Sequence, residues 1–503
     1  MTGIREIKLT NSMSGKREVL KTLEPGKLKM YSCGPTVYDH IHIGNLRAAL
    51  VSDLFFRYFK RAGYEVTYVR NYTDVDDRII KRANDEKIST DEFTKKYIQA
   101  VEMDYAVAGM HEPTHKTTVT GHMSEIIKMI TEIIAHGNAY IADDGEVNYA
   151  IDTFEGYGKL SHKNIEDLQA GIRVEVNSKK KNPLDFTLWK PVKPGEPSWD
   201  SPWGKGRPGW HIECSAMARK WLGDQLDVHH GGEDLQFPHH ENEIAQSEAA
   251  TGHAPYVGYW LHNAFLNMSK EKMSKSLGNV ITARDFLTRF SGEIARYLLL
   301  SVHYRSLIDF NDDAVEHALQ GLHRIYEAKA KALELLTRGR ARADMRAEAA
   351  WGEFAASCEK ARREIEDCYA NDLNTAGALG VLFTLIREFN RTIAEPLAQA
   401  TPSAVLGAGE LIKILEDEMG SVLGIGRLDP AKALSDIERV KMERLQATGT
   451  PKPDADEIQA LVQARIDARK AKDFAKADEI RKELDARGVI IKDNPTGTAW
   501  EYK

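Results

Sequence analysis

Two short motifs far apart in the chain carry residue types that can bind a triphosphate. One reads Lys-Met-Ser-Lys-Ser and places Lys272 and Lys275 three residues apart among small hydroxyl residues. The other, upstream, places His42, Gly44 and Asn45 at the start of a long amphipathic segment. Taken alone, the lysines could belong to a solvated loop, and His42 could be a helix-capping residue. Together they predict a site that holds ATP from opposite sides.

The chemistry that these groups favour is adenylate formation. A helix that begins near Gly44 offers unpaired amides and the positive end of its dipole, and glycine lets the backbone approach a phosphate closely. His42 can donate a hydrogen bond. The two lysines can stabilise the charge that develops when a carboxylate attacks the α-phosphorus and pyrophosphate leaves. None of these groups is a strong nucleophile, which argues against a covalent phospho-enzyme.

A second set of residues has the chemistry of a metal site. His239 and Glu243 are four residues apart, on one face of an expected helix, while Cys33 ends an expected strand and Cys214 stands far from both. One imidazole, one carboxylate and two thiolates suit zinc. The spacing alone leaves a polar cluster beside the ATP site equally open. Other residues compete as ligands: His229, His230, His240, Glu213 and Glu241.

The elements around the first motif indicate a nucleotide-binding α/β fold. Residues 28–33 read as a short strand, residues 44–61 have apolar side chains at helical spacing, and residues 65–72 resemble a buried strand. Strand, turn, helix and strand in this order open a doubly wound fold. The glycine pattern of a dinucleotide site, G-x-G-x-x-G, does not occur there.

An insertion is expected to interrupt the parallel sheet between residues 112 and 209. A helix at 123–135 and a hairpin at 140–151 with an Asp-Gly turn give this stretch an α+β character. The sheet is expected to resume at 226–229 and to close near 258–265.

Beyond residue 310 the sequence becomes helical, and residues 448–453 are typical of a linker. A charged helix pair is expected at 457–487, followed by a compact tail that carries Trp500, which could stack on a nucleic-acid base or pack in a core. Basic residues of the pair suit RNA phosphates, although interleaved aspartates also fit a salt-bridged surface: Arg465, Arg469, Lys470, Lys472 and Lys476.

Length and composition indicate a multidomain protein of the cytoplasm. A chain of 503 residues is too long for one ordinary domain. No apolar run approaches the length of a membrane span, and the N-terminus lacks a secretory core. The four cysteines include no C-x-x-C pair and do not make a disulfide framework. The net charge of −7 does not decide about a nucleic-acid partner, since a basic face can coexist with an acidic whole.

The motifs, in this order, resemble those of cysteinyl-tRNA synthetases, which are class I aminoacyl-tRNA synthetases. The shared strings are YSCGPT at 31–36, HIGN at 42–45, RNYTDVDD at 70–77, GWHIECSAM at 209–217, FPHHENE at 237–243 and the lysine loop from Lys272. The resemblance covers nearly the whole chain and is looser in the C-terminal half. It implies a ligase that activates L-cysteine with ATP and transfers it to the 3′ end of tRNA(Cys).

The resemblance further implies one zinc ion per subunit, bound by Cys33, Cys214, His239 and Glu243 and in direct contact with the substrate sulfur. A thiol has an unperturbed pKa of about 8.5 and zinc lowers it, so a thiolate–zinc bond forms at neutral pH. The hydroxyl of serine stays protonated and is a weaker ligand. Rejection of serine then needs no editing step, because the site selects by ligand chemistry.

The remaining pocket residues are also assigned by the resemblance. Amino-acid binding falls to Gly34, Thr36, Thr73, Trp210 and His229, and nucleotide binding to Gly44, Gly231, Gly232, Asp234 and Lys275. The expected catalytic groups are His42, Asn45, Lys272 and Lys275, with Mg²⁺ accompanying ATP. A cytoplasmic monomer without membrane contact is expected, whose partners are tRNA(Cys), L-cysteine and ATP.

Two positions depart from the family pattern. Asn45 stands where many class I enzymes have a second histidine, and it can donate a hydrogen bond to phosphate but cannot become cationic. His230 stands where the family often has glycine, and a side chain there would crowd or hydrate the rim of the pocket.

The expected fold class is an α/β Rossmann-like nucleotide-binding catalytic domain with an inserted α+β subdomain, an α-helical bundle and a small C-terminal α+β anticodon-binding module. The catalytic halves are expected at 1–111 and 210–310, the second with the lysine loop, and the connective insertion at 112–209. The tRNA-binding bundle is expected at 311–447 and the anticodon-binding module at 448–503.

Two rival functions share parts of this pattern. A cysteine ligase of the mycothiol type would keep the ATP and zinc residues but pass cysteine to a small amine. Such ligases, by resemblance, lack the full anticodon module that this chain has, and a charging assay with total tRNA separates the two. A non-catalytic tRNA-binding paralogue would be expected to have degenerate phosphate and metal motifs, whereas both are intact here.

Replacing Lys275 by alanine is expected to lower the rate of adenylate formation far more than the affinity for cysteine. The lysine is directed at charge that develops only in the transition state, so its loss affects the chemical step. Cysteine-dependent exchange of pyrophosphate into ATP measures the first quantity, and equilibrium cysteine binding the second. Equal losses in both would contradict this role.

Overall fold

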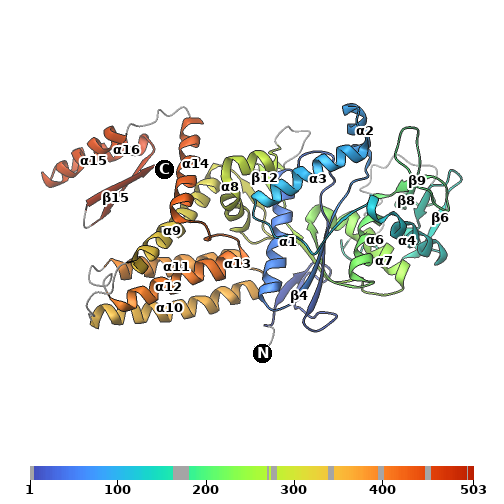
Figure 1. The fold of residues 1–503 in the computed structure, drawn as a ribbon, viewed down its shortest axis with the longest axis horizontal. Coiled ribbons are helices and arrows are strands. Elements are labelled where there is room, and N and C mark those ends of the chain that lie inside the picture. The colour runs from blue at the N-terminus through green and yellow to red at the C-terminus, as the bar shows by residue number, and fades with distance from the viewer. Residues whose placement is uncertain are drawn as a thin grey trace.

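The computed structural model describes residues 5–162, 180–268, 271–272, 280–337, 345–394, 401–447, 455–494 and 497–502. Figure 1 shows an elongated arrangement with the insertion at one end, a central sheet beside α1, and the helical bundle with the C-terminal module at the other end. Lys275 lies outside the described residues, as do the predicted linker at 448–453 and most of the lysine loop.

A parallel sheet of five strands forms the centre of the catalytic part. Its order is β11-β10-β3-β4-β5, and every neighbouring pair is parallel. The strands are β3 (Lys27–Ser32), β4 (Glu65–Tyr72), β5 (His115–Thr118), β10 (Leu226–Gly232) and β11 (Val257–Asn263). The strands predicted on both sides of the insertion therefore lie in one sheet, and the prediction of a doubly wound fold is confirmed.

Helices cover both faces of this sheet. On one face lie α1 (Ile43–Arg61) and α8 (Ala283–Leu300), and on the other α6 (Trp210–Leu222) and α7 (Glu241–Thr251). The apolar residues that predicted the α1 helix are buried, with Leu46, Leu50 and Phe55 each fully inaccessible. Burial of this apolar stripe against the sheet is what fixes the position of the helix start.

Between β4 and β5 the chain forms α2 (Asp77–Glu86) and α3 (Thr90–Val107). The inserted segment contains α4 (Met123–Ala135) and an antiparallel sheet of four strands, which confirms its predicted α+β character. Its strands are β6 (Ala139–Ile141), β7 (Val147–Tyr149), β8 (Phe186–Pro191) and β9 (Gly206–Pro208). The β6–β7 hairpin turns at Gly145, whose φ of +85° suits glycine.

Two small sheets were not anticipated from the sequence. The N-terminal strands β1 (Lys8–Asn11) and β2 (Lys16–Val19) pair antiparallel. The strand β12 (Leu266–Met268) lies between β13 (Glu271–Lys272) and β14 (Ile308–Phe310). Lys272 pairs with Asn267 in this sheet, so the lysine loop starts from the edge strand β13, which is paired with the central strand β12.

The C-terminal half is helical, as predicted. The bundle contains α9 (Asp312–Thr337), α10 (Met345–Ala370), α11 (Thr375–Ile393), α12 (Pro402–Lys413), the short α13 (Gly420–Val422) and α14 (Pro430–Ala447). Beyond it lie α15 (Ala455–Lys470), α16 (Phe474–Ala486) and the hairpin of β15 (Val489–Asn494) and β16 (Gly497–Tyr502).

The small C-terminal core shows where the side chains of Trp500 and Arg465 lie. Trp500 packs against the cluster that contains Ile458 and Val462, and its indole Nε1 donates to Gln459 Oε1 at 3.0 Å. Arg465 is buried, so its prediction as an exposed phosphate contact is wrong: its position on α15 faces the core. The other four basic residues of the pair are exposed.

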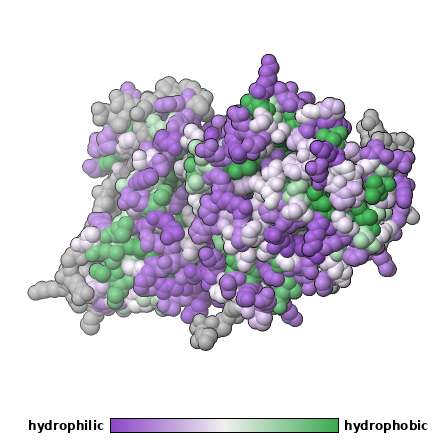
Figure 2. All heavy atoms as spheres, turned by 45° about the vertical axis from the view of Figure 1, so that its right-hand side comes forward, coloured by the Kyte–Doolittle hydropathy of each residue, from purple (hydrophilic) through white to green (hydrophobic). Residues whose placement is uncertain are grey.

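The surface in Figure 2 is predominantly hydrophilic, with apolar residues in small separate patches. Among the described residues, none of the helices combines the length and apolar character needed to cross a bilayer.

A buried ion cluster joins α1 and α8, the helices on one face of the parallel sheet, to the bundle. Asp53 of α1 accepts hydrogen bonds from Arg57 at 2.6 Å and from the His111 amide at 2.8 Å, and it pairs with Arg296 of α8 at 2.8 Å. Arg296 also donates to the carbonyl of Leu423, just after α13, at 2.6 Å. Although burial disfavours the carboxylate, the two guanidinium groups lower the pKa of Asp53.

Replacing Asp53 by asparagine is expected to destabilise the protein by about 3–5 kcal/mol, because two buried arginines would lose the carboxylate that they share. The midpoint of urea unfolding, followed by fluorescence, measures the effect. Asp91→Asn is the control: its partner Lys95 is 72% exposed and Asp91 itself 74%, so the change should stay below about 1 kcal/mol. Equal shifts for the two variants would contradict the importance of the buried cluster.

Candidate active site

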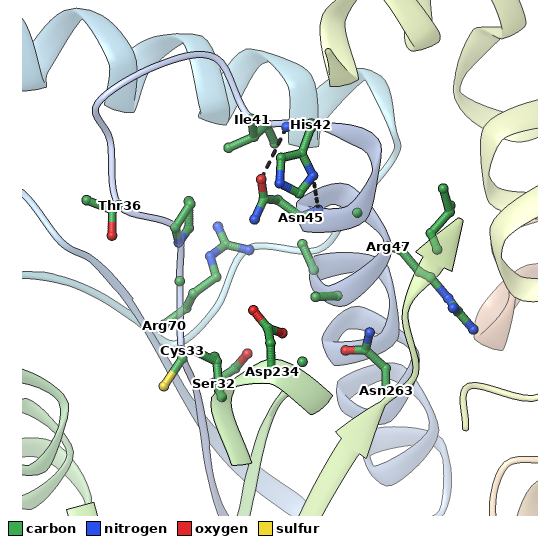
Figure 3. Close-up of a pocket in the computed structure, with 18 of the residues that line it drawn as sticks. Ser32, Cys33, Thr36, Ile41, His42, Asn45, Arg47, Arg70, Asp234 and Asn263 are labelled. Atoms are coloured by element: carbon green, nitrogen blue, oxygen red, sulfur yellow. Dashed lines mark hydrogen bonds between the residues drawn. The ribbon is translucent and has the colours of Figure 1, made fainter. Parts of the chain in front are cut away.

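A cavity of about 380 Å³ opens at the carboxyl ends of β3 and β10. At this point the sheet order reverses, because β3 continues to β4 on one side while β10 and β11 lie on the other. Ligands of doubly wound folds bind at such a switch point. Figure 3 shows the cavity with side chains entering from β3, from the start of α1 and from the segment after β10.

The start of α1 forms one wall of the cavity. Nδ1 of His42 accepts a hydrogen bond from the Asn45 amide, and Oδ1 of Asn45 accepts one from the His42 amide, both at 3.2 Å (Figure 3). In neutral His42 the proton must then be on Nε2, which can donate to a phosphate. Asn45 completes this capping box, so its carbonyl oxygen is committed and its amide hydrogens are what it can offer to a ligand.

The opposite wall follows β10. Asp234 points its carboxylate into the cavity, and Gly232 and Asn263 lie beside it (Figure 3). Gly231 cannot be replaced without displacement of its neighbours, since a Cβ there would lie 2.7 Å from the His240 ring. The predicted adenosine-binding passage therefore faces the start of α1 across one cavity.

Next to Cys33, a buried cluster brings together all four predicted zinc ligands. The sulfur atoms of Cys33 and Cys214 are 3.7 Å apart, and Cys33 Sγ lies 3.6 Å from Glu243 Oε1. His239 Nε2 is 3.0 Å from the same carboxylate oxygen. One donor atom from each residue lies within 4.8 Å of all the others, which is close enough for a single ion to bind them together.

The four ligands come from separate elements. Cys33 follows β3, Cys214 lies on α6, His239 belongs to the π-helical turn Gln236–His240, and Glu243 is in the first turn of α7. The i,i+4 spacing of His239 and Glu243 does put both on one face, across the junction of the π-helical turn with α7.

The charges of the cluster are strongly coupled. Burial raises the pKa of the Cys33 thiol, whereas its hydrogen bond to Cys214 lowers the pKa of that second thiol to about 6. Burial alone would lower the pKa of His239, but the Cys214 thiolate and the Glu243 carboxylate together outweigh burial and raise the pKa to about 10. Burial opposes ionisation of Glu243 as well, yet His229 and His239 lower its pKa to about 2. With protons on Cys33 and His239, the cluster holds one cation, His239, beside the two anions Cys214 and Glu243, so it favours further positive charge.

A second layer of histidines surrounds the cluster. His229 Nε2 contacts the other oxygen of Glu243 at 3.0 Å, and its ring stacks on Trp260. His240 Nε2 lies 3.5 Å from Cys33 Sγ, while its Nδ1 contacts His262 at 2.8 Å. Cys33, His229, His240 and Glu243 therefore form a second set of converging donors, and geometry alone allows either set to hold an ion.

The predicted site residues are divided between the cavity wall and the layer behind it. Lining the cavity are Cys33, Gly34, Thr36, His42, Gly44, Asn45, Trp210, Gly232 and Asp234. Cys214, His229, His239 and Glu243 are buried behind that wall, as is Thr73, whose hydroxyl donates to Glu213 at 3.3 Å. Trp210 is 39% exposed and lies over His239, with ring centroids 4.5 Å apart.

The expectation that His230 would crowd the rim is wrong. Its side chain is inaccessible to solvent and points to α1, where Nδ1 contacts the Ser52 hydroxyl at 2.8 Å and the ring packs on Phe55. A residue in a strand sends its side chain to one face of the sheet, and here that face is the one covered by α1.

Three arginines that sequence reasoning did not assign also border the cavity: Arg47, Arg70 and Arg78. Arg70 follows a run of mostly apolar strand residues. A buried charge is unusual in such a strand, and this contrast was the sequence signal that could have identified Arg70 as a site residue. Arg47 donates to four backbone carbonyls, those of residues 264, 265, 304 and 306, and so holds the segment before β12 against α1. The sequence contains no signal for that contact, because its acceptors are backbone atoms far along the chain.

Family models match three parts of the chain. The model of the class I (C) tRNA synthetase catalytic domain matches residues 19–320, the DALR domain 365–425, and the cysteinyl-tRNA ligase anticodon binding domain 455–500. The first alone covers more than half of the chain.

Curated relatives match over the full length. A cysteine–tRNA ligase of Geobacter sulfurreducens is 48% identical over 497 residues, covering 99% of this chain and 100% of the relative. The enzymes of the same name from Geobacter metallireducens and Geotalea daltonii are 46% and 45% identical, with the same coverage.

Solved structures show the same fold at low identity. Methionyl-tRNA synthetase of Mycobacterium tuberculosis, in complex with methionyl-adenylate, superposes with a TM-score of 0.61 at 13% identity, over 81% of this chain and 93% of that one. A ternary complex of Agrobacterium radiobacter K84 agnB2 LeuRS with tRNA and LeuAMS gives 0.56 at 11% identity, over 82% and 87%.

Replacing Gly34 by alanine is expected to lower cysteine-dependent pyrophosphate exchange by at least about 100-fold, because misplacement of the Cys33 segment by about 1 Å is enough for such a loss. A Cβ on Gly34 would lie 1.6 Å from the Asn71 carbonyl oxygen, so the end of β3 must move away from β4. Gly352→Ala, at a helical position where a Cβ meets nothing within 4 Å, is the control and should leave exchange unchanged. Normal exchange by the Gly34 variant would show that this close approach is dispensable.

Proposed function

The chain belongs to the cysteine–tRNA ligase family, and we propose that it recognises its amino acid through a zinc ion bound by Cys33, Cys214, His239 and Glu243. It is an aminoacyl-tRNA synthetase that charges tRNA(Cys) with cysteine at the expense of ATP. The observation that carries the zinc proposal is the convergence of four donor atoms within 4.8 Å of one another, beside the cavity that would hold ATP.

The donor set fits zinc. Two thiolates, an imidazole and a carboxylate are its common protein ligands. A divalent cation would take the place of the protons on Cys33 and His239, since metal ligands must be deprotonated. The second set of donors, which includes His229 and His240, contains one thiolate, whereas the first set contains two. Because thiolates are the softer ligands, zinc is expected to prefer the first set.

Zinc at this site would lower the pKa of the substrate thiol and bind its thiolate, which serine cannot match. The protein's own residues orient the rest of the site. His229 holds one oxygen of Glu243 and so directs the other oxygen toward the thiols. Trp210 covers His239 from the cavity side and offers an apolar wall to the amino acid.

In the activation step, a carboxylate oxygen of cysteine attacks the α-phosphorus of ATP. The bond from phosphorus to the oxygen that bridges to the β-phosphate breaks, and pyrophosphate leaves with Mg²⁺. No proton is transferred. Nε2 of His42, the amides near Gly44 and the side-chain amide of Asn45 would bind the phosphates, with Lys272 and Lys275 approaching from the other side.

In the transfer step, a terminal ribose hydroxyl of tRNA(Cys) attacks the carbonyl carbon of the adenylate. The bond from this carbon to the phosphate oxygen breaks, and the hydroxyl proton passes to the departing AMP. The adenosine would be held by Gly231, Gly232 and Asp234 in both steps. Exposed basic side chains of the helix pair would contact tRNA phosphates: those of Arg469, Lys470, Lys472 and Lys476. A cytoplasmic, monomeric state stays a prediction.

Replacing single ligands tests the zinc assignment. Cys214→Ser is expected to lower zinc affinity by at least about tenfold and to weaken the preference for cysteine, whereas His240→Gln should retain the metal. Metal analysis after dialysis, paired with cysteine- and serine-dependent pyrophosphate exchange, measures both effects. Cys368→Ser, which changes a partly buried thiol outside the cluster, is the matched control.

The opposite result, loss of zinc with His240→Gln and retention with Cys214→Ser, would assign the second donor set. A wild-type enzyme that is active without metal, or that uses serine as well as cysteine, would refute the zinc proposal altogether.

A further inference from the structure

Arg70 brings a buried positive charge to the wall of the cavity. It lies on β4 and is 2% exposed. Its Nη2 atom is 3.2 Å from the Tyr72 hydroxyl and 3.4 Å from Glu102 Oε1, and its guanidinium carbon is 4.4 Å from the centre of the Tyr105 ring. All the contacts with polar partners therefore lie on one corner of the guanidinium.

The other two nitrogen atoms have no such partner. Nε and Nη1 are both buried and find no hydrogen-bond acceptor among the residues that the structure describes. Buried charged donors without an acceptor are rare and unfavourable, and they are retained mainly where a ligand supplies the missing partner. This arginine is also one of the residues that line the cavity.

The position of Arg70 shows which part of the substrates it can reach. In the sheet Arg70 pairs with Ser32, the residue before Cys33, and a Cβ on Gly34 would lie 3.6 Å from its Cγ. Figure 3 shows its guanidinium directed from the Cys33 side toward Asn45. Arg70 is therefore between the cluster that would take the substrate sulfur and the helix start that would take the triphosphate.

The atoms that must occupy this intermediate position are the cysteine carboxylate and the α-phosphate, because they link the sulfur end to the triphosphate end. We propose that Arg70 donates Nε and Nη1 hydrogen bonds to this anionic junction and stabilises it as the new bond forms. The inference rests on the proposed function. A guanidinium edge presents two parallel donors, which matches a carboxylate or a phosphate, and it stays protonated throughout.

A purely structural role is the competing explanation. Glu102 accepts from Arg70 and also from Tyr72 and Lys116, so the arginine could serve only to complete a surface-linked ion network. That role uses Nη2 alone, however. It gives no function to Nε and Nη1, which have no acceptor among the described residues.

The test compares Arg70→Met and Arg70→Lys in the full-length enzyme loaded with zinc or with cobalt. Arg70→Met is expected to lower the kcat of pyrophosphate exchange by about 100- to 1000-fold, as for loss of a transition-state donor, and Arg70→Lys should recover part of it. Cysteamine, which has the thiol and amine of cysteine but no carboxylate, should still bind to the cobalt enzyme within about threefold, read from the sulfur–cobalt absorption band.

Glu102→Gln is the matched control, because it removes the carboxylate partner but keeps the arginine. Exchange by this variant should fall by less than about fivefold. The inference is overturned if Arg70→Met stays within about fivefold of wild type, if Glu102→Gln loses as much as Arg70→Met, or if cysteamine binding falls together with kcat. Should Arg70→Met fail to fold, Arg70→Lys carries the test, with an expected loss in kcat and unchanged cysteamine binding.

Failure of the zinc proposal would look different. Wild-type cobalt enzyme would then show no absorption band with cysteamine, while the kinetic comparison of Arg70→Met with Glu102→Gln would still decide the role of the arginine.

Discussion

Two thiolates and a carboxylate can share one buried space only if positive charge compensates them. In this protein the compensation is arranged by four elements that converge on Cys33: the end of β3, the first turns of α6 and α7, and the π-helical turn before α7. Burial raises the pKa of Cys33; burial acts the other way on His239, where the Cys214 and Glu243 anions raise the pKa to about 10, so the cluster favours bound positive charge. A divalent cation satisfies the same requirement, and it adds a reason to prefer a thiol over a hydroxyl in the substrate.

The cavity brings this cluster and the start of α1 together because both lie at the switch point of the parallel sheet. β3 ends just before Cys33, and the chain then passes to the capping box of His42 and Asn45 at the start of α1. The separation between the cluster and the start of α1 is therefore set by the short segment after β3. Close approaches at Gly34 and Gly231 let neighbouring strands and helices meet without side chains between them.

Buried arginines connect this pocket to the rest of the molecule. Arg47 holds the segment before β12 against α1, and Arg296 joins Asp53 of α1 to the bundle beyond α13. Protein carbonyls and a carboxylate accept from most nitrogens of these two groups, and each has one buried nitrogen without an acceptor among the described residues. Arg70 has two such nitrogens, Nε and Nη1, at the wall of the cavity.

The sequence alone predicted the parallel strands on both sides of the insertion, the α1 helix, the hairpin at Gly145 and the helical C-terminal half. Each depends on local periodicity or turn chemistry, which neighbouring residues determine. It also indicated zinc-type ligands, because residue type and the i,i+4 pair at His239 and Glu243 carry that chemistry. Only the tertiary structure decided that His230 points to α1, that Arg465 faces a core, that a second donor set surrounds Cys33, and that Arg70 borders the cavity with two donors unsatisfied. Those facts depend on which elements pack together across hundreds of residues, and packing of this kind leaves no local pattern in the chain.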